Sequence, residues 1–145
     1  MIIKTNLIIP NTQRAATVGP FILVRPGSED DLPLRYHEFE HVRQWWWATF
    51  LGILAVGLFM LGADHLGYTV DEHWAAVAAL NSLWLHGVLY VISGKYRLWA
   101  ELRGHQEEYL RDKRRLNQLA ANLSTNYALR LDYATALDLI RGVRS

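Results

Sequence analysis

The fold of this chain is decided by residues 45–62, whose sequence is WWWATFLGILAVGLFMLG and which carry no charged side chain. Residues 74–94 form a second stretch without a charged side chain. Each stretch is about as long as the roughly 20 residues that a helix needs to cross a bilayer. The connection between them contains Gly67 and Asp71, residue types that interrupt helices. The pattern predicts a long antiparallel helical hairpin with its tip near Gly67.

The N-terminal residues, 1–30, are expected to be extended. Phe21-Ile22-Leu23-Val24 is rich in β-branched and aromatic residues, and Gly-Pro and Pro-Gly pairs bound it on either side. This pattern predicts a short strand at about 21–25. A strand at about 2–9 is its candidate partner.

Helices account for most of the remaining chain. Ser28, followed three residues later by Asp31, has the pattern of a helix start. The second helix of the hairpin is expected to bend at Ser93-Gly94. The expected boundaries are about 32–61 and 71–120 for the hairpin helices, within residues 31–120, and about 133–143 for a last amphipathic helix, within a C-terminal segment 124–145. We therefore expect one mainly α domain over residues 1–145 with a short N-terminal β element.

Composition narrows the chemistry that the chain can perform. The chain has 145 residues and no cysteine, so a metal ion would have to bind to His, Asp or Glu. The formal net charge is +1, which is unlike the broad basic surface of nucleic-acid-binding proteins. The basic residues of 111–115 are interleaved with acids and have the pattern of a solvated helix face. No nucleic-acid partner is expected.

The run His37-Glu38-Phe39-Glu40-His41 lies at the start of the first expected helix. Two histidines four residues apart lie on one helix face, close enough to share a metal ion. Glu38 is then placed to take a proton from a metal-activated water as a general base. Glu40 has the wrong helical phase to join this face. The alternative is a surface helix whose two histidines are satisfied by ordinary hydrogen bonds.

The path of the hairpin predicts a third ligand. At equal rise per residue, the returning helix reaches the level of His37 and His41 again near residues 93–102. Glu101 falls there, and no other acid lies between Glu72 and Glu107. His105, one turn further on the same face, is the rival ligand or a neighbour that supports the ligands.

The motif also carries a family resemblance. His37-Glu38-x-x-His41 with a Glu on a later helix resembles the gluzincin pattern of zinc metallopeptidases. The longer pattern His-Glu-Phe-Glu-His-Val-Arg-Gln-Trp, an apolar span and Tyr-Arg-x-x-x-Glu is similar to small HExxH proteins of bacteria and bacteriophages. It covers about residues 21–109. The resemblance implies a zincin-like domain in which His37, His41 and Glu101 bind zinc and Glu38 is the base.

Two departures from larger gluzincins concern the rest of the active site. There is no Asn-Glu-x-x-Ser-Asp sequence around Glu101, and there is no room for a large C-terminal domain that supplies a residue to stabilise the transition state. Within this chain the candidates for that role, or for support of the ligands, are Tyr36, His105, Arg97 and Tyr109.

The expected function is hydrolysis of peptide bonds in a peptide or protein substrate by a zinc-activated water. In larger zincins an edge strand beside the active helix holds the substrate backbone, and the strand at about 21–25 could do so here. The first alternative is a non-enzymatic structural, virion or membrane component with a vestigial or structural metal site. The second is a small membrane adaptor without a metal, which binds a partner through its tryptophans.

Charge and aromatic residues predict the setting of the hairpin. Aromatic residues sit at the ends of both uncharged stretches, where membrane-interface belts form. Lys and Arg flank the motif side, whereas the connection near Gly67 carries only acids, so the positive-inside rule places the metal site on the cytoplasmic side. Residues 45–62 and 74–94 would then contact lipid. The alternatives are a soluble protein whose core is the hairpin, which Asn81 and His86 would suit, and a virion component whose hairpin contacts neighbouring subunits.

Overall fold

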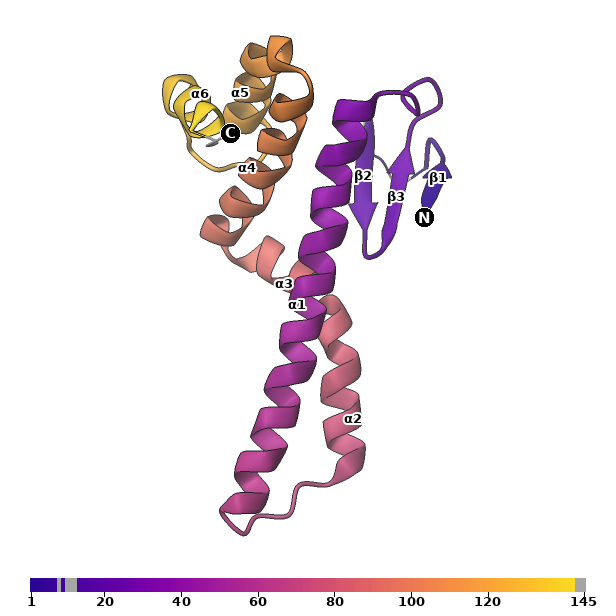
Figure 1. The fold of residues 1–145 in the computed structure, drawn as a ribbon, viewed down its shortest axis with the longest axis vertical. Coiled ribbons are helices and arrows are strands. Elements are labelled where there is room, and N and C mark those ends of the chain that lie inside the picture. The colour runs from indigo at the N-terminus through magenta and orange to yellow at the C-terminus, as the bar shows by residue number, and fades with distance from the viewer. Residues whose placement is uncertain (8, 10–12, 143–145) are drawn as a thin grey trace.

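The structure is a computed structural model that describes residues 1–7, 9 and 13–142. A small sheet and several short helices form a head at one end of a long helical hairpin (Figure 1). We call the part formed by the sheet, the start of the first helix and all residues after 93 the head. The expectation of a mainly α chain with an N-terminal β element and a C-terminal helix is confirmed.

The N-terminal sheet has three strands, β1 (Ile2–Lys4), β2 (Ala15–Val18) and β3 (Phe21–Val24), in the order β1-β3-β2. β1 pairs with β3 in parallel, which confirms the predicted strand and its partner. β2 pairs with β3 as an antiparallel hairpin through Gly19, whose φ of 59° suits glycine. β2 was not predicted, because two of its four residues are alanines, which have little strand preference. β3 is therefore the central strand and β2 an edge strand.

Helix α1 (Leu32–His65) runs through the head and the whole hairpin. The side chain of Asp31 caps it by accepting a hydrogen bond from the amide of Leu34 at 3.1 Å. Ser28, which the pattern favoured, instead accepts from the amide of Asp31 through its carbonyl and closes the preceding turn. The predicted start near residue 32 is thus confirmed, and the cap lies three residues later than expected.

The return of the hairpin is a series of helices, so the expectation of one helix over 71–120 is wrong. A 3₁₀ turn interrupts it at Ser82, whose hydroxyl bonds back to the carbonyl of Ala78. The predicted bend at Ser93-Gly94 is correct, since Ser93 has extended backbone angles and caps the next helix. A further helix boundary lies at Asp112, which has extended backbone angles. The elements are α2 (Glu72–Asn81), η1 (Ser82–Trp84), α3 (Leu85–Ile92), α4 (Gly94–Arg111), η2 (Lys113–Arg115), α5 (Leu116–Thr125) and α6 (Tyr133–Arg141).

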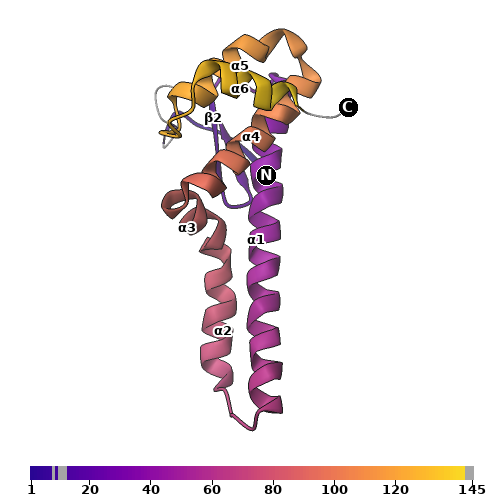
Figure 2. The same ribbon diagram turned by 90° about the vertical axis from the view of Figure 1, so that its left-hand side faces the viewer.

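The head contains two small apolar cores, one on each side of α1. On one side the sheet packs Ile22 and Val24 against α1. On the other side α4 faces α1, and α5 and α6 enclose a core around Leu123 and Ile140 (Figures 1 and 2). The predicted last helix is confirmed as far as Arg141, and position 143 lies outside the described residues. The start of α1 is therefore held between the sheet and α4.

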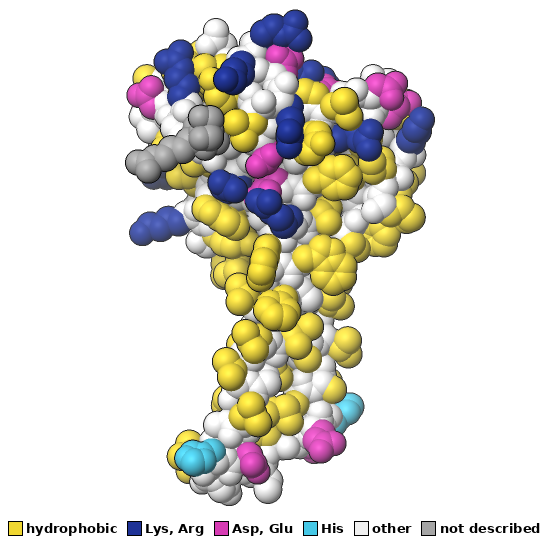
Figure 3. All heavy atoms as spheres, in the orientation of Figure 1, with side chains coloured by type: hydrophobic (Ala, Val, Ile, Leu, Met, Phe, Trp, Pro, Cys, Tyr) yellow, Lys and Arg dark blue, Asp and Glu magenta, His cyan; other side chains and the backbone are white. Residues whose placement is uncertain are grey.

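The hairpin packs tightly at its crossing point and is otherwise exposed. A Cβ on Gly52 would lie 2.5 Å from the hydroxyl of Ser82, so glycine allows the close approach of α1 and η1. The indole of Trp45 donates a hydrogen bond to the carbonyl of Leu83 at 2.8 Å. In the most apolar 18-residue segment of each hairpin arm only 11% of the residues are buried, and apolar side chains cover the hairpin in Figure 3. The hairpin is therefore not the core of the described chain, and both of its helices are long and apolar enough to cross a membrane.

Candidate metal centre

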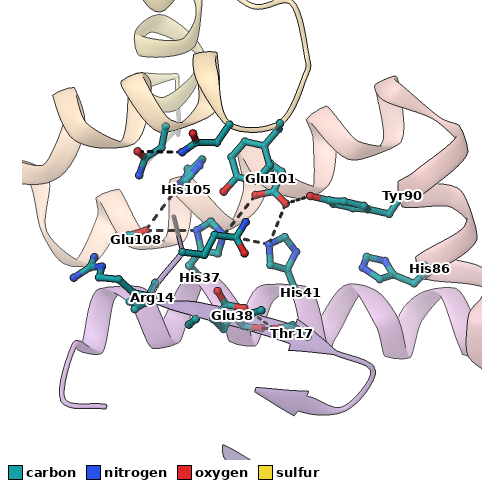
Figure 4. A pocket seen from close by; sticks show the side chains of 18 of the residues that line it. Arg14, Thr17, His37, Glu38, His41, His86, Tyr90, Glu101, His105 and Glu108 are labelled. Carbon is teal, nitrogen blue, oxygen red and sulfur yellow. Dashed lines mark hydrogen bonds and ion pairs between the residues drawn. The ribbon is translucent and has the colours of Figure 1, made fainter. Parts of the chain in front are cut away.

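The two histidines of the motif face α4 across the middle of the head (Figure 4). His37 and His41 lie one turn apart on α1, and their Nε2 atoms are 3.1 Å apart. Glu101 of α4 reaches both: Oε2 lies 3.7 Å from Nε2 of His37, and Oε1 lies 3.7 Å from Nε2 of His41. All three side chains are buried. The structure thus brings together the three residues that the sequence had singled out as ligands.

The spacing of these atoms is compatible with a bound metal ion, and zinc serves as the example. Zinc bonds of about 2.0–2.2 Å place neighbouring ligand atoms roughly 3.4 Å apart. The two imidazole nitrogens are 3.1 Å apart, and each lies 3.7 Å from a different oxygen of Glu101, so all of these separations are close to that value. Oε2 of Glu101 is buried and has no hydrogen-bond partner among the described residues. A buried carboxylate oxygen without a partner is unfavourable unless a cation binds it, so these residues could hold a metal ion.

Gln44 orients His41 from behind. Its Oε1 lies 3.0 Å from Nδ1 of His41, and its amide nitrogen donates to the carbonyl of Ala100 at 3.2 Å. A proton on Nδ1 leaves Nε2 of His41 free to face Glu101. Sequence reasoning missed this role, although Gln44 follows His41 by nearly one turn, a spacing that could have indicated it.

Glu38 lies on the side of α1 that faces the sheet and the pocket. The hydroxyl of Thr17 on β2 lies 2.7 Å from Oε2 of Glu38 and 3.1 Å from the carbonyl of the same residue. This contact joins the edge strand to the motif and fixes the carboxylate (Figure 4). Glu40 points away and forms an ion pair with Arg43 at 2.6 Å. The helical phase therefore separates the two acids as expected.

A second group of candidate ligands lies behind His37. Glu108 Oε2 is 3.5 Å from Nδ1 of His37 and 4.0 Å from Nδ1 of His105. Arg115 fixes Glu108 by an ion pair at 3.0 Å and also reaches Asp31 at 2.9 Å. Each of the two ring nitrogens of His37 therefore faces a carboxylate, Nε2 that of Glu101 and Nδ1 that of Glu108. Sequence reasoning missed Glu108, because its position depends on how α4 packs.

The electrostatics of the metal-free centre follow from this crowding. Burial alone would lower the pKa of His37, but the carboxylates of Glu101 and Glu108 beside its two ring nitrogens raise it to about 10. Burial alone would raise the pKa of Glu101, but the imidazoles of His37 and His41 lower it to about 2. Burial, together with the charge on His37, lowers the pKa of His105 to about 3. The centre thus holds carboxylates ready for a cation, and His105 is neutral.

Two tyrosines face Glu101, and the sequence did not single them out. The hydroxyl of Tyr90 donates a hydrogen bond to Oε1 of Glu101. Tyr127 lines the same pocket, and burial and the charge of Glu101 raise the pKa of its phenol, which keeps the phenol protonated. Arg97 supports both tyrosines by donating to the carbonyls of Tyr90 at 3.0 Å and Tyr127 at 3.2 Å.

Of the four residues proposed as supporting groups, only His105 lines the pocket. Tyr36 lies outside it, because it follows a different helical phase from His37, and its ring packs under Arg111. Tyr109 packs against the core of α5 and α6. Arg97 lies outside the pocket, where it donates to backbone carbonyls of Tyr90, Val91 and Tyr127 and lies over the ring of Tyr90. Three of the predicted supporting groups, Tyr36, Tyr109 and Arg97, therefore lie outside the pocket and do not face the candidate ligands.

Gly104 makes the close approach of α4 possible. A Cβ at this position would lie 2.9 Å from the ring of His37, which is too close for an unstrained contact. The glycine thus lets the imidazole of His37 lie directly against the α4 backbone. The sequence had given no reason to single out Gly104.

The centre opens into a pocket of about 600 Å³. β2, α1, α3, α4 and α5 all contribute to its lining. Glu38, His37, His41 and Glu101 share this lining, so the candidate ligands and the candidate base face one space. The arrangement could hold a metal ion beside a carboxylate base.

No protein-family model, curated protein or solved structure matches this chain. The resemblance to gluzincins therefore stays a prediction from the sequence motif.

Proposed function

We propose that this chain is a zinc-dependent metallopeptidase that hydrolyses peptide bonds, with the metal held by His37, His41 and Glu101. The observation that carries the proposal is the convergence of these three ligands at ion-binding distance, with Glu38 beside them in an open pocket. Imidazole and carboxylate together suit zinc. A structural zinc site has four protein ligands and no open coordination position. Here three candidate ligands leave one position open, beside the buried acid Glu38.

The chain's own residues divide the chemical work. A bound zinc ion would supply Lewis acidity, which polarises a carbonyl and lowers the pKa of a water molecule. Glu38 takes the proton of the attacking water and passes it to the leaving amine. Thr17 holds the Glu38 carboxylate by its hydroxyl, so that the base is oriented before substrate arrives. Gln44 and Glu108 orient the two imidazoles from behind.

Tyr127 is our candidate for the group that stabilises the transition state. Its side chain is half-buried and lines the pocket, and its phenol interacts with Glu101. A protonated phenol can donate a hydrogen bond to the oxyanion that forms as water attacks the carbonyl. Tyr90 is already bonded to Glu101, so we assign it the role of orienting that ligand.

The edge strand that holds substrate is β2 rather than the strand predicted at 21–25. The amide of Arg25 on the β3 side bonds the carbonyl of Arg14, which fixes the alternation of the antiparallel ladder. The backbone groups of Ala15 and Thr17 consequently point away from β3. Both residues line the pocket, so an extended peptide could add to this edge beside Glu38.

We place the hairpin in a bilayer with the metal centre on the cytoplasmic side. Large apolar side chains of the hairpin are exposed, including Leu58 at 59% and Phe59 at 67%. No Lys or Arg occurs between residues 44 and 94, whereas basic side chains surround the head. Two polar groups of the second uncharged stretch have partners: Asn81 donates to the carbonyl of Val77, and His86 bonds to the hydroxyl of Tyr96.

The second candidate is a non-enzymatic virion or membrane component with a structural metal. The near-complete burial of the ligands favours it, since Glu101 is 3% exposed. Chelation separates the two functions. A structural ion would contribute a large share of the folding free energy, so its removal would unfold the head. We expect a moderate fall in melting temperature and a head that stays folded.

The test of the proposed function compares two acids of the same motif. Purified protein in detergent should bind one zinc ion per chain and hydrolyse fluorescently labelled casein. Glu38→Gln should keep its zinc and lose activity by about 10²- to 10⁴-fold, because the general base is removed. Glu40→Gln is the matched control and should retain activity, since Glu40 pairs with Arg43 outside the pocket. Zinc-loaded protein whose hydrolysis is unchanged by Glu38→Gln would contradict the proposal.

A further inference from the structure

The pocket of the metal centre extends onto the hairpin. Four of its lining residues, His86, Gly87, Tyr90 and Val91, belong to α3, which is part of the second uncharged stretch. In Figure 4, Tyr90 and His86 lie on the same side of the pocket as His41. One wall of the pocket is therefore built from the apolar hairpin and the others from the polar head.

The length of α1 places this wall at the membrane surface. From Trp45 to His65 the helix is about 32 Å long at 1.5 Å per residue, which matches a hydrocarbon core of about 30 Å. The indole of Trp45 bonds to Leu83, immediately before α3. His41 lies one turn, about 6 Å, on the other side of Trp45. If Trp45 marks the boundary, α3 lies at the interface and the metal centre, held by His41 and His37, lies about 6 to 12 Å outside the hydrocarbon.

The outer face of α3 is suited to that position. Val88 and Ile92, which do not line the pocket, are 50% and 73% exposed. Figure 2 shows that α3 leaves the line of α2 and projects sideways below α4. An apolar helix that lies across the end of a transmembrane hairpin would rest on the lipid interface.

The opposite end of the pocket is lined by amide side chains. Gln13, Gln118 and Asn122 contribute to it from the loop before β2 and from α5. Carboxamides both donate and accept, so they can bond to a peptide backbone whatever its sequence. The pocket thus has an apolar end near the membrane and a polar end away from it, with the edge of β2 alongside.

We propose that the substrate is the cytoplasmic juxtamembrane segment of a second, membrane-anchored protein. The segment leaves the bilayer over α3 and lies along β2 in extended form. This inference rests on the proposed peptidase function and adds the substrate class. An extended chain covers about 3.3 Å per residue, so the bond beside Glu38 is about two to five residues from the membrane boundary.

The experiment uses zinc-loaded protein in phosphatidylcholine–phosphatidylglycerol nanodiscs. The probe is a Leu-Ala transmembrane peptide with a 20-residue Gly-Ser-Ala-Phe extension that carries a benzophenone at successive positions. The comparison probe is the same extension without the span. Cross-linking reports binding, and mass spectrometry reports the site of cleavage. Both should be confined to about two to five residues from the membrane, and a spacer inserted next to the span should move them to new residues at the same distance.

Two glycine variants provide a matched pair within the hairpin. A Cβ on Gly87 or on Gly57 would meet nothing within 4 Å, so both sites tolerate a side chain. Gly87 lines the pocket and Gly57 does not. Gly87→Leu should lower cross-linking and cleavage of the anchored probe roughly tenfold or more, because it narrows the membrane end of the pocket. Gly57→Leu should leave both unchanged.

The outcomes separate this inference from the proposed function. Cross-links at a fixed membrane distance without any cleavage would support the substrate position and contradict the peptidase. Cleavage that occurs equally in the probe without a span, or that spreads along the extension, would overturn the juxtamembrane substrate and leave the peptidase in place. Absence of cross-links to either probe would overturn the inference as well.

Discussion

Globular proteins usually bury apolar side chains and expose charged ones. The head departs from this distribution by burying ionisable side chains, and the hairpin departs from it by exposing apolar ones. The head buries acids and histidines, including Glu101, His105 and Glu108, each of which is at most 4% exposed. The hairpin exposes leucines, phenylalanines and tryptophans along most of its length (Figure 3). Each region therefore fits the partner that we propose for it: a cation for the head and an apolar medium for the hairpin. The difference shows that the two halves can be tested separately.

The largest expected effect is loss of the metal by one change in the head. Glu101→Ala should weaken zinc binding on the order of 100-fold or more, because it removes one of three protein ligands. Glu107→Ala on the same helix is the control, since Glu107 pairs only with Arg111 at 3.9 Å among the described residues. Zinc content by mass spectrometry after dialysis measures both. Equal zinc retention in the two variants would contradict the ligand assignment.

The next effect concerns the hairpin alone. Leu58→Arg should oppose membrane insertion by about 3 kcal/mol, because it places a charge near the centre of the bilayer. Leu110→Arg is the control, since Leu110 is a comparably exposed leucine in the head. The fraction of protein that resists carbonate extraction from membranes reports insertion. If both variants behave alike and the chain is soluble without detergent, the hairpin meets protein rather than lipid.

A smaller effect is expected from the packing of α4. Gly104→Ala should push the ring of His37 away from its position and weaken zinc binding by about 10- to 100-fold. Gly94→Ala is the control, since a Cβ there meets nothing within 4 Å. Competition with a chelator of known affinity measures the change. Unchanged affinity in Gly104→Ala would mean that His37 does not hold the ion from its observed position.

The metal-free head should be most stable near pH 6.5. The pKa of His37 is raised to about 10, so its contribution is complete below pH 6.5 and is lost as the pH rises toward 10. The pKa of His105 is lowered to about 3, so its contribution is complete above pH 6.5 and is lost as the pH falls toward 3. Each proton changes stability by at most about 1.4 kcal/mol per pH unit.

Thermal unfolding of the chelated protein from pH 4 to 9 tests this maximum. With zinc bound, stability should rise rather than fall as the pH increases above 6.5, because the imidazole ligands must be neutral and zinc binding strengthens with pH. A flat profile without the metal would show that the two histidines are not held as described.

Sequence reasoning succeeded where the signal was local or followed from helix geometry. The two uncharged stretches predicted the hairpin, and the spacing of His37 and His41 placed both on one face of a helix. Equal rise per residue brought Glu101 to the right level. The break at Ser82 was missed because no glycine or proline occurs between residues 68 and 86 to indicate it. Tyr127 and Glu108 were missed because only the packing of α4 and α5 brings them to the pocket. Whether zinc binds remains a prediction from the ligands.

The most direct test of the central claim is X-ray absorption at the zinc edge, on protein loaded with one equivalent of zinc in detergent. We predict a zinc coordination shell of nitrogen and oxygen atoms at about 2.0–2.1 Å, with the multiple scattering of two imidazoles. In Glu101→Ala the set of coordinating atoms should differ. Folded protein that retains no zinc, or a spectrum with no imidazole contribution, would contradict this claim.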